Sequence, residues 1–195
     1  DQSIKTLEIP NLNNDFFKGI DIKQEKQFLL AENNNDNNEE SVLISEIIIE
    51  GWENHPEGRK LELAAYDSMS IKPGSIVNNQ ILNQDLNAIY ASGWFSGVKI
   101  KSQEGPLGVR LIVEVVPNPI LKKVELKPIN SLISNEYVDD IFNNYYGTTL
   151  NLNEIQNKIE IIKKRYEKEG YSLARITGPD RISENGVVTL KVSEG

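Results

Sequence analysis

Two stretches of this chain share one apolar pattern, and together they decide its fold. The first is Ile44-Ser45-Glu46-Ile47-Ile48-Ile49-Glu50-Gly51, and the second is Leu121-Lys122-Lys123-Val124-Glu125-Leu126-Lys127-Pro128. Apolar residues stand at matching positions in both, and the second stretch begins 77 residues after the first. A pattern repeated at a fixed spacing indicates two copies of one structural unit.

Two further landmarks recur at the same spacing. Gly93-Trp94 is repeated as Gly170-Tyr171, and Leu111-x-Val113-x-Val115 is repeated as Val188-x-Leu190-x-Val192. Three landmarks at one offset are hard to obtain by chance. The sequence therefore predicts one unit at residues 42–117 and a second at residues 118–195.

Each unit begins with an alternating segment. In the first unit the alternation predicts a half-buried strand over residues 41–50, with Leu43, Ile47 and Ile49 on the buried face. The periods of the apolar residues place the later elements. Helices are expected at roughly 59–68 and up to Gly93 in the first unit, and at 135–145 and up to Gly170 in the second. Strands are expected at 98–101 and 109–116 in the first unit, and at 172–177 and 187–193 in the second.

The element order in each unit is strand, helix, helix, strand, strand. This order predicts an α+β fold in which two helices cover one face of a three-stranded sheet. The two units meet at Pro117, Asn118 and Pro119. Because proline fixes its own φ and restricts the residue before it, we expect a short and semi-rigid joint.

Residues 1–41 differ from the two units. They are rich in acidic residues and asparagine, and their apolar residues show no sustained period of 2 or 3.6. We expect a disordered acidic arm and linker. The alternative is a short recognition segment, around 12–17 or 28–30, that docks on a partner or on the body of the protein.

Composition excludes several function classes. The chain has 195 residues, a formal charge of −8 and no cysteine. It lacks the clustered Lys and Arg that a nucleic-acid binder needs, thiolate chemistry, and a run of about 18 apolar residues that could span a membrane. His55 is the only imidazole and lies in a polar turn, and the pair Asp139-Asp140 is typical of a solvated surface. We therefore expect no catalytic site, no metal and no cofactor.

Several motifs together resemble POTRA domains, the polypeptide-transport-associated repeats. They are the opening Ile47-x-Ile49-x-Gly51, the run Ala91-Ser92-Gly93-Trp94-Phe95-Ser96-Gly97-Val98 and the ending Val192-x-Glu194-Gly195. Pro106-Leu107-Gly108-Val109-Arg110 and the joint Val116-Pro117-Asn118-Pro119 are similar to the cyanobacterial and chloroplast branch of outer-membrane barrel-assembly and protein-translocation proteins. The resemblance covers residues 42–195.

The resemblance implies a non-enzymatic role and a mixed sheet in each tandem repeat. Such domains lie on the periplasmic face of the outer membrane, or on the intermembrane side in a plastid, where they receive unfolded outer-membrane protein precursors. It further implies a C-terminal membrane β-barrel and another POTRA repeat, both outside this chain. The alternatives are a two-partner secretion transporter, a cell-division scaffold protein, and a structural spacer or interaction scaffold.

The edges of the predicted sheets are the candidate binding site. An edge strand presents unpaired backbone groups that an extended peptide can join whatever its side chains are. In the family the third strand also pairs with the first, which leaves the rim of the second strand free. The candidate edge residues in the two units are Val98, Lys99, Ile100, Lys101, Leu173, Ala174, Arg175 and Ile176. The lysines either guard such an edge against aggregation or only solubilise a hairpin.

Overall fold

The computed structural model describes residues 4–8, 41–128, 132–178 and 182–194. The chain divides into two compact units, of which the first ends at Pro117 and the second continues from Asn118 to the C-terminus. We call them unit 1 and unit 2 and describe each by itself. No helix in the described ranges is long and apolar enough to cross a membrane.

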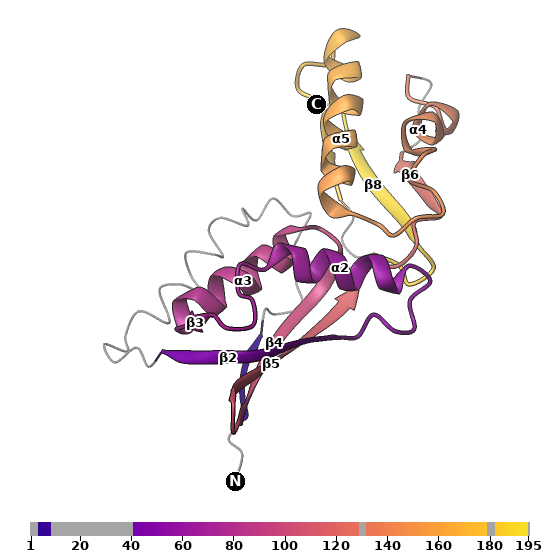
Figure 1. The fold of residues 1–195 in the computed structure, drawn as a ribbon. Helices are drawn as coiled ribbons and strands as arrows, with labels where there is room; N and C mark the ends of the chain where they lie inside the picture. Colours follow the sequence, from indigo (N-terminus) through magenta and orange to yellow (C-terminus); the bar gives the residue numbers. More distant parts are fainter. Residues whose placement is uncertain (1–3, 9–40, 129–131, 179–181, 195) are drawn as a thin grey trace. The chain divides into compact units, whose positions relative to one another are not determined.

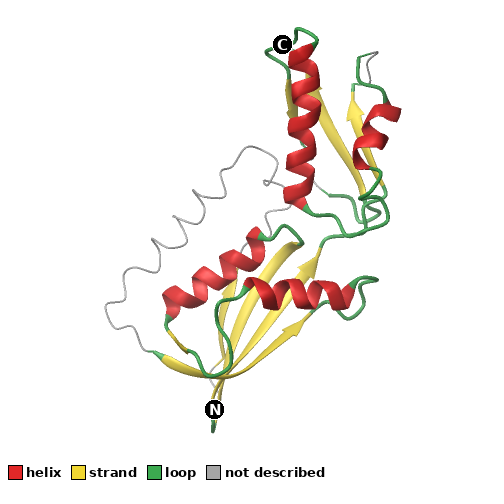
Figure 2. Ribbon diagram, turned by 45° about the horizontal axis from the view of Figure 1, so that its top comes forward, coloured by secondary structure: helices red, strands yellow, loops and turns green. Residues whose placement is uncertain are grey.

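Unit 1 is a mixed sheet with two helices on one face (Figures 1 and 2). Its elements are β1 (Ile4–Glu8), β2 (Val42–Glu50), α2 (Gly58–Ser68), β3 (Ile76–Val77), α3 (Asn79–Ala91), β4 (Phe95–Gly105) and β5 (Gly108–Pro117). The strand order is β1-β4-β5-β2-β3. The β4–β5 hairpin is antiparallel, and β2 lies parallel to β5. The expected three strands are present, and β1 and β3 extend the sheet at its two sides.

Alternation and capping explain why these segments form their elements. Every second residue of β5 from Val109 to Val115 is buried beneath the helices, as a half-buried strand requires. Helix α3 begins after Asn78, whose side chain accepts a hydrogen bond from the Ile81 N–H. It ends before Gly93, whose φ of 86° is the left-handed conformation expected there.

Unit 2 repeats this architecture with fewer strands. Its elements are β6 (Lys123–Lys127), α4 (Asn135–Phe142), α5 (Leu152–Lys168), β7 (Arg175–Thr177) and β8 (Val187–Ser193). The sheet order is β6-β8-β7, with β6 parallel and β7 antiparallel to β8. Its core includes Val124, Leu190 and Tyr166. The α+β fold predicted from the repeat is confirmed.

One backbone turn shows how closely the units correspond. In unit 1 the Ile44 N–H donates to Ser75 O and Ile44 O accepts from Gly74 N–H. In unit 2 the Leu121 N–H donates to Thr148 O and Leu121 O accepts from Gly147 N–H. The start of each unit is thus tied to the same turn, although the turn follows four residues sooner in the sequence of unit 2.

The buried face of β2 differs from the prediction. A β-bulge interrupts its register with β5 between Ile44 and Glu46. Because the extra residue reverses the alternation, Leu43 is 47% exposed and Ile44 is fully buried, while Ile49 beyond the bulge faces the core as expected. The prediction that Leu43 belongs to the buried face was wrong.

The expected disordered arm contains a strand. Residues 4–8 form β1, which pairs with β4 in antiparallel register. The rest of the expected arm, together with both alternative recognition segments, lies outside the described residues apart from Ser41.

The joint contains no intervening segment. Pro117 is the last residue of β5, and Asn118 already belongs to unit 2, where its Nδ2 donates to Leu150 O at 3.1 Å. Pro119 O accepts from the Leu150 N–H at 2.9 Å. The chain therefore passes directly from one unit into the next, and the restricted motion expected of this joint stays a prediction.

Candidate functional site

The outer rim of β4 can be assigned residue by residue. A two-residue turn, Pro106-Leu107, joins β4 to β5 and makes Gly105 and Gly108 a hydrogen-bonded pair. Every second residue of β4, counted back from Gly105, therefore directs its backbone N–H and C=O at β5. Gln103, Lys101 and Lys99 therefore direct their N–H and C=O groups at β5. Ile100 and Ser102 direct theirs at the opposite rim.

That rim is occupied by β1. The register places Leu7 opposite Ile100 and Lys5 opposite Ser102, and it runs from Ile4 at Gln103 to Glu8 at Lys99. The rim was expected to be free, and the pairing with β1 corrects that expectation. This pairing could not be predicted from the residues of β4, because the partner strand lies more than 90 residues away in the sequence.

The side chains of the β4 candidate residues alternate as expected. Val98 and Ile100 are buried beneath the helices, and Lys99 and Lys101 are half-buried. The Lys101 Nζ lies 2.6 Å from a Glu114 carboxylate oxygen on β5. Lys101 therefore makes a cross-strand ion pair on the face away from the helices and is not a freely solvated cation.

The corresponding edge of unit 2 is the outer rim of β7. Leu173 is 75% exposed and Ala174 is 3% exposed, and both precede the strand, which begins only at Arg175. The expected edge of residues 173–176 is therefore shorter than predicted. Along the described chain no strand lies beyond β7 in this sheet.

The backbone directions in β7 can be derived from the hydrogen bonds of β6. The Val124 N–H donates to a side chain on the side away from β8. In a parallel pair only one of two register partners directs its N–H and C=O at the other strand, so Val188, the partner of Val124, directs its groups at β6. Lys191, three positions further along β8, then faces β7 and pairs with Thr177. Ile176 consequently directs its N–H and C=O at the open rim.

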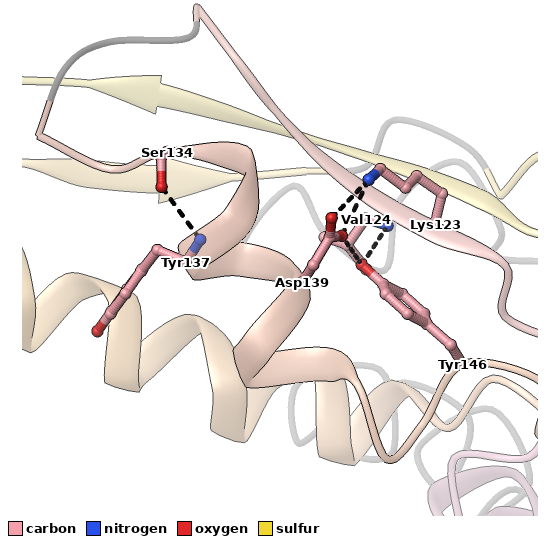
Figure 3. Close-up of polar contacts among 6 residues, drawn as sticks. All are labelled: Lys123, Val124, Ser134, Tyr137, Asp139 and Tyr146. Carbon is pink, nitrogen blue, oxygen red and sulfur yellow. Dashed lines mark hydrogen bonds and ion pairs between the residues drawn. The ribbon is translucent and has the colours of Figure 1, made fainter.

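A tyrosine hydroxyl caps the edge of β6 (Figure 3). The Tyr146 hydroxyl accepts a hydrogen bond from Val124 N–H at 3.1 Å and donates to an Asp139 carboxylate oxygen at 2.7 Å. The Lys123 Nζ contacts both oxygens of that carboxylate, at 3.0 and 2.7 Å. Asp139 is thus paired, which corrects its interpretation as solvated surface, and the three side chains occupy the edge where another strand could join.

The charges of this network shift two pKa values. The hydrogen bond from Lys123 lowers the pKa of Asp139, opposed by burial and assisted by Tyr146. Burial, followed by the bond to Asp139, raises the pKa of Tyr146 to about 12. Sequence reasoning missed this network because Lys123, Asp139 and Tyr146 come from three separate segments with no spacing signal.

Replacing Tyr146 with Phe should lower the unfolding free energy of unit 2 by about 1–2 kcal/mol, because the Val124 N–H loses its acceptor. The raised pKa adds a pH dependence: the tyrosine stabilises fully below about pH 10, its unfolded pKa, and less as the pH rises toward 12. Urea unfolding at pH 8 and at pH 11 measures both effects.

Tyr145→Phe is the matched control, since the Tyr145 hydroxyl donates to Glu154 and caps no strand. It should change stability less at pH 8. Equal losses for the two variants at pH 8 would show that the β6 cap contributes nothing particular.

The remaining edge of unit 1 is partly covered. Strand β3 pairs with the start of β2, and the Trp52 Nε1–H donates to Ile49 O at 2.7 Å near its end. Between β2 and α2 lies an open groove of about 610 Å³, whose apolar lining includes Ile48, Leu63 and Tyr66. Trp52 therefore occupies a backbone acceptor that a strand added to β2 would need.

A metal site would need a cluster of His, Asp or Glu side chains. Nowhere in the described ranges do three or more His, Asp or Glu side chains gather in a way that could hold a metal ion. The His55 Nδ1 accepts a hydrogen bond from Glu57 N–H at 3.0 Å within its own turn. This contact gives the only histidine of the chain a structural role in the turn that precedes α2.

Two successive β-α-α-β-β units, each with a mixed sheet under two helices, define a tandem of POTRA domains. A family model described as "POTRA domain, ShlB-type" matches residues 120–195. The structure of POTRA1-2 of the periplasmic domain of Omp85 from Anabaena is 40% identical, with a TM-score of 0.69, and the match covers 81% of this chain and 98% of that one. The chain belongs to the POTRA domains of the Omp85 family.

Other relatives agree. The N-terminal domain of Omp85 from the thermophilic cyanobacterium Thermosynechococcus elongatus is also 40% identical, with a TM-score of 0.72, over 81% of this chain and 65% of that chain. Outer envelope protein 80, chloroplastic, from Oryza sativa subsp. japonica is 27% identical over 80% of this chain and 23% of its own length. Its namesake from Arabidopsis thaliana is 26% identical over 97% of this chain and 25% of its own length. The chain thus spans about a quarter of these curated relatives.

Proposed function

We propose that this chain is the substrate-receiving, chaperone-like module of an outer-membrane β-barrel assembly or protein-translocation factor, and that it binds unfolded precursors by strand addition. The pairing of β1 with β4 supports this proposal most directly. The outer rim of β4 accepts a five-residue extended segment from outside the repeat, in regular antiparallel register. An edge that accepts one extended segment through its backbone has the hydrogen-bonding geometry to accept another.

The open rim of β7 supplies the second candidate edge. Backbone pairing is tolerant of side chains, so one edge can receive many precursors that share only a tendency to form strands. The module needs no catalytic residues for this role. With a formal charge of −8 it also has no general affinity for nucleic acid.

The family relationship supports the setting of this role. The similar Anabaena structure is described as part of a periplasmic domain, and the plant relatives are described as chloroplastic outer envelope proteins. In our proposal the chain lies on the periplasmic face of the outer membrane, or on the intermembrane side in a plastid. Its partners are unfolded precursors, a membrane β-barrel C-terminal to it and a further POTRA repeat.

A double proline variant tests strand addition. Ser102→Pro with Ile176→Pro removes one outward N–H from β4 and one from β7. Ser102→Ala with Ile176→Ala also removes the native side-chain groups beyond Cβ but keeps both N–H groups. An outer-membrane barrel protein diluted from urea should bind the proline pair at least about fivefold more weakly than the alanine pair, because each lost hydrogen bond costs about 1 kcal/mol.

Fluorescence anisotropy of the labelled precursor measures both affinities, and circular dichroism verifies the fold of both variants. Equal affinities for the two folded variants would exclude strand addition at these edges. A chain that binds no precursor in any form would instead act as a spacer between the barrel and its partners.

A further inference from the structure

Among the residues that the structure describes, the arm strand β1 has no counterpart in unit 2. It lies N-terminal to the first repeat and joins the rim of β4, whereas the corresponding rim of β7 has no strand beyond it in the described part of unit 2. The two repeats therefore differ at the surface proposed to bind precursors: one edge is open and the other is occupied. The core and the helices of unit 1 follow the shared repeat without requiring β1.

Strand β1 uses the backbone groups that a precursor would use. The outward residues of β4 in the paired segment are Ile100 and Ser102, and the register places them opposite Leu7 and Lys5. In an antiparallel pair the residues that exchange hydrogen bonds lie directly opposite each other. Leu7 and Lys5 thus satisfy those groups, and a second strand cannot add to the same rim while β1 remains.

We propose that β1 is a built-in competitor, which holds the strand-addition edge of unit 1 closed until a precursor displaces it. This inference rests on the proposed function. The pairing is short, with five register positions, and β1 joins the rest of unit 1 through more than 30 intervening residues. Because β1 belongs to the same chain as its edge, its effective concentration there is higher than that of a separate peptide, and a pairing of only five positions still allows it to leave.

Competition has a quantitative consequence. The apparent affinity of an edge equals its intrinsic affinity multiplied by the fraction of molecules in which the edge is open. Unit 1 therefore binds weak strand-formers poorly and responds mainly to segments that pair better than β1 does. The described part of unit 2 holds no strand that would impose such a threshold, so the two edges differ in stringency although their folds match.

Two proline substitutions in β1 distinguish the loss of a hydrogen bond to β4 from the mere introduction of a proline. Leu7→Pro removes an N–H that points at β4, whereas Thr6→Pro removes one that points away from it. Both are made in the complete chain with Ile176→Pro, so that the rim of β7 contributes little. Leu7→Pro should raise the affinity for a urea-unfolded barrel precursor at least about fivefold, and Thr6→Pro should change it less than about twofold.

A synthetic peptide with the sequence of residues 2–9 tests the inference without any precursor. It should bind the Leu7→Pro chain and should not bind the chain with native β1, and the Ile100 and Ser102 amides should exchange hydrogen faster in Leu7→Pro. If the peptide binds both chains equally, or if Leu7→Pro leaves amide exchange and precursor affinity unchanged, β1 is no competitor.

The two proposals fail differently. If the peptide binds only the Leu7→Pro chain and no variant binds precursor, the result supports occupation of the β4 rim by β1 and refutes the proposed precursor role. Sedimentation distinguishes the source of the strand. If β1 pairing depends on protein concentration and the chain dimerises, the edge is closed by a second copy, and the intramolecular competitor is overturned.

Discussion

Gly186→Ala is expected to destabilise unit 2 by about 3 kcal/mol or more, near the upper end of single-residue effects. Gly186 has a φ of +78°, and a Cβ added there would lie 1.9 Å from the carbonyl oxygen of Ile120. Because the obstacle is backbone, the opening of unit 2 must shift to accommodate the methyl group. Urea unfolding followed by far-UV circular dichroism should show an early transition for unit 2 and an unchanged transition for unit 1.

Gly147→Ala provides the matched control. Gly147 has a similar φ of +84°, but a Cβ added there meets nothing within 4 Å. It should therefore cost only the left-handed backbone penalty, about 1–2 kcal/mol. If the two substitutions cost the same, the close approach at Ile120 does not constrain the fold.

The close approach at Gly186 belongs to the repeat. In unit 1 a Cβ on Gly108 would lie 2.8 Å from the carbonyl oxygen of Leu43. Leu43 and Ile120 are 77 residues apart, the same offset as the apolar pattern. In unit 1 the start of the last strand thus packs against backbone at the start of β2, and in unit 2 against backbone just before β6, so in both units this contact joins the two ends of the POTRA unit.

The parts of the fold encoded in local patterns could be predicted. Alternation in β5, the stripe of α5 and the glycines that end α3 and α5 each follow from residues within one segment. Where a pattern is irregular in one unit, the clearer pattern at the matching position of the other unit supported the prediction. The first helix illustrates this, because its predicted range of 59–68 differs by one residue from α2.

The parts that depend on distant partners could not be predicted. The bulge before Glu46 is set by the packing of β2 against β5, and alternation alone placed Leu43 on the wrong face. Helix α4 ends at Phe142, three residues earlier than its apolar stripe suggested, because the chain turns there toward Tyr146, whose hydroxyl caps β6. Capping by a side chain from another segment leaves no period in the sequence.

The sheet positions of the two candidate strands could be predicted, but the pairing of their rims could not, and precursor binding at these rims stays a prediction. The second strand of each unit does form an edge of the core sheet, because the β-α-α-β-β order places it there. The sequence contained no local signal that residues 4–8 would cover one of those edges. A single strand of five residues shows too little alternation to be recognised, and its pairing depends on an edge formed by residues 99–103.

Asp85→Ala is expected to destabilise unit 1 by about 3 kcal/mol, because one buried donor and two part-buried donors lose their carboxylate acceptor. Asp85 is 2% exposed and accepts three hydrogen bonds, from Ser70 N–H at 3.0 Å, Ser70 Oγ–H at 2.7 Å and Ile71 N–H at 2.8 Å. These bonds anchor the segment that leads into β3. Since β3 covers the start of β2, the variant should also expose backbone there and increase self-association.

Ser70→Ala measures the contribution of the serine hydroxyl by itself, because it removes one of the three hydrogen bonds to Asp85 and keeps the two backbone donors paired. It should cost about 1 kcal/mol, and Asp85→Asn, which keeps one acceptor oxygen, should fall between the two variants. Urea unfolding measures the stabilities, and sedimentation measures association. A loss below about 1 kcal/mol for Asp85→Ala would mean that water replaces the carboxylate, and the segment before β3 would then hold its place through the packing of Met69 and Ile71 and through its remaining hydrogen bonds.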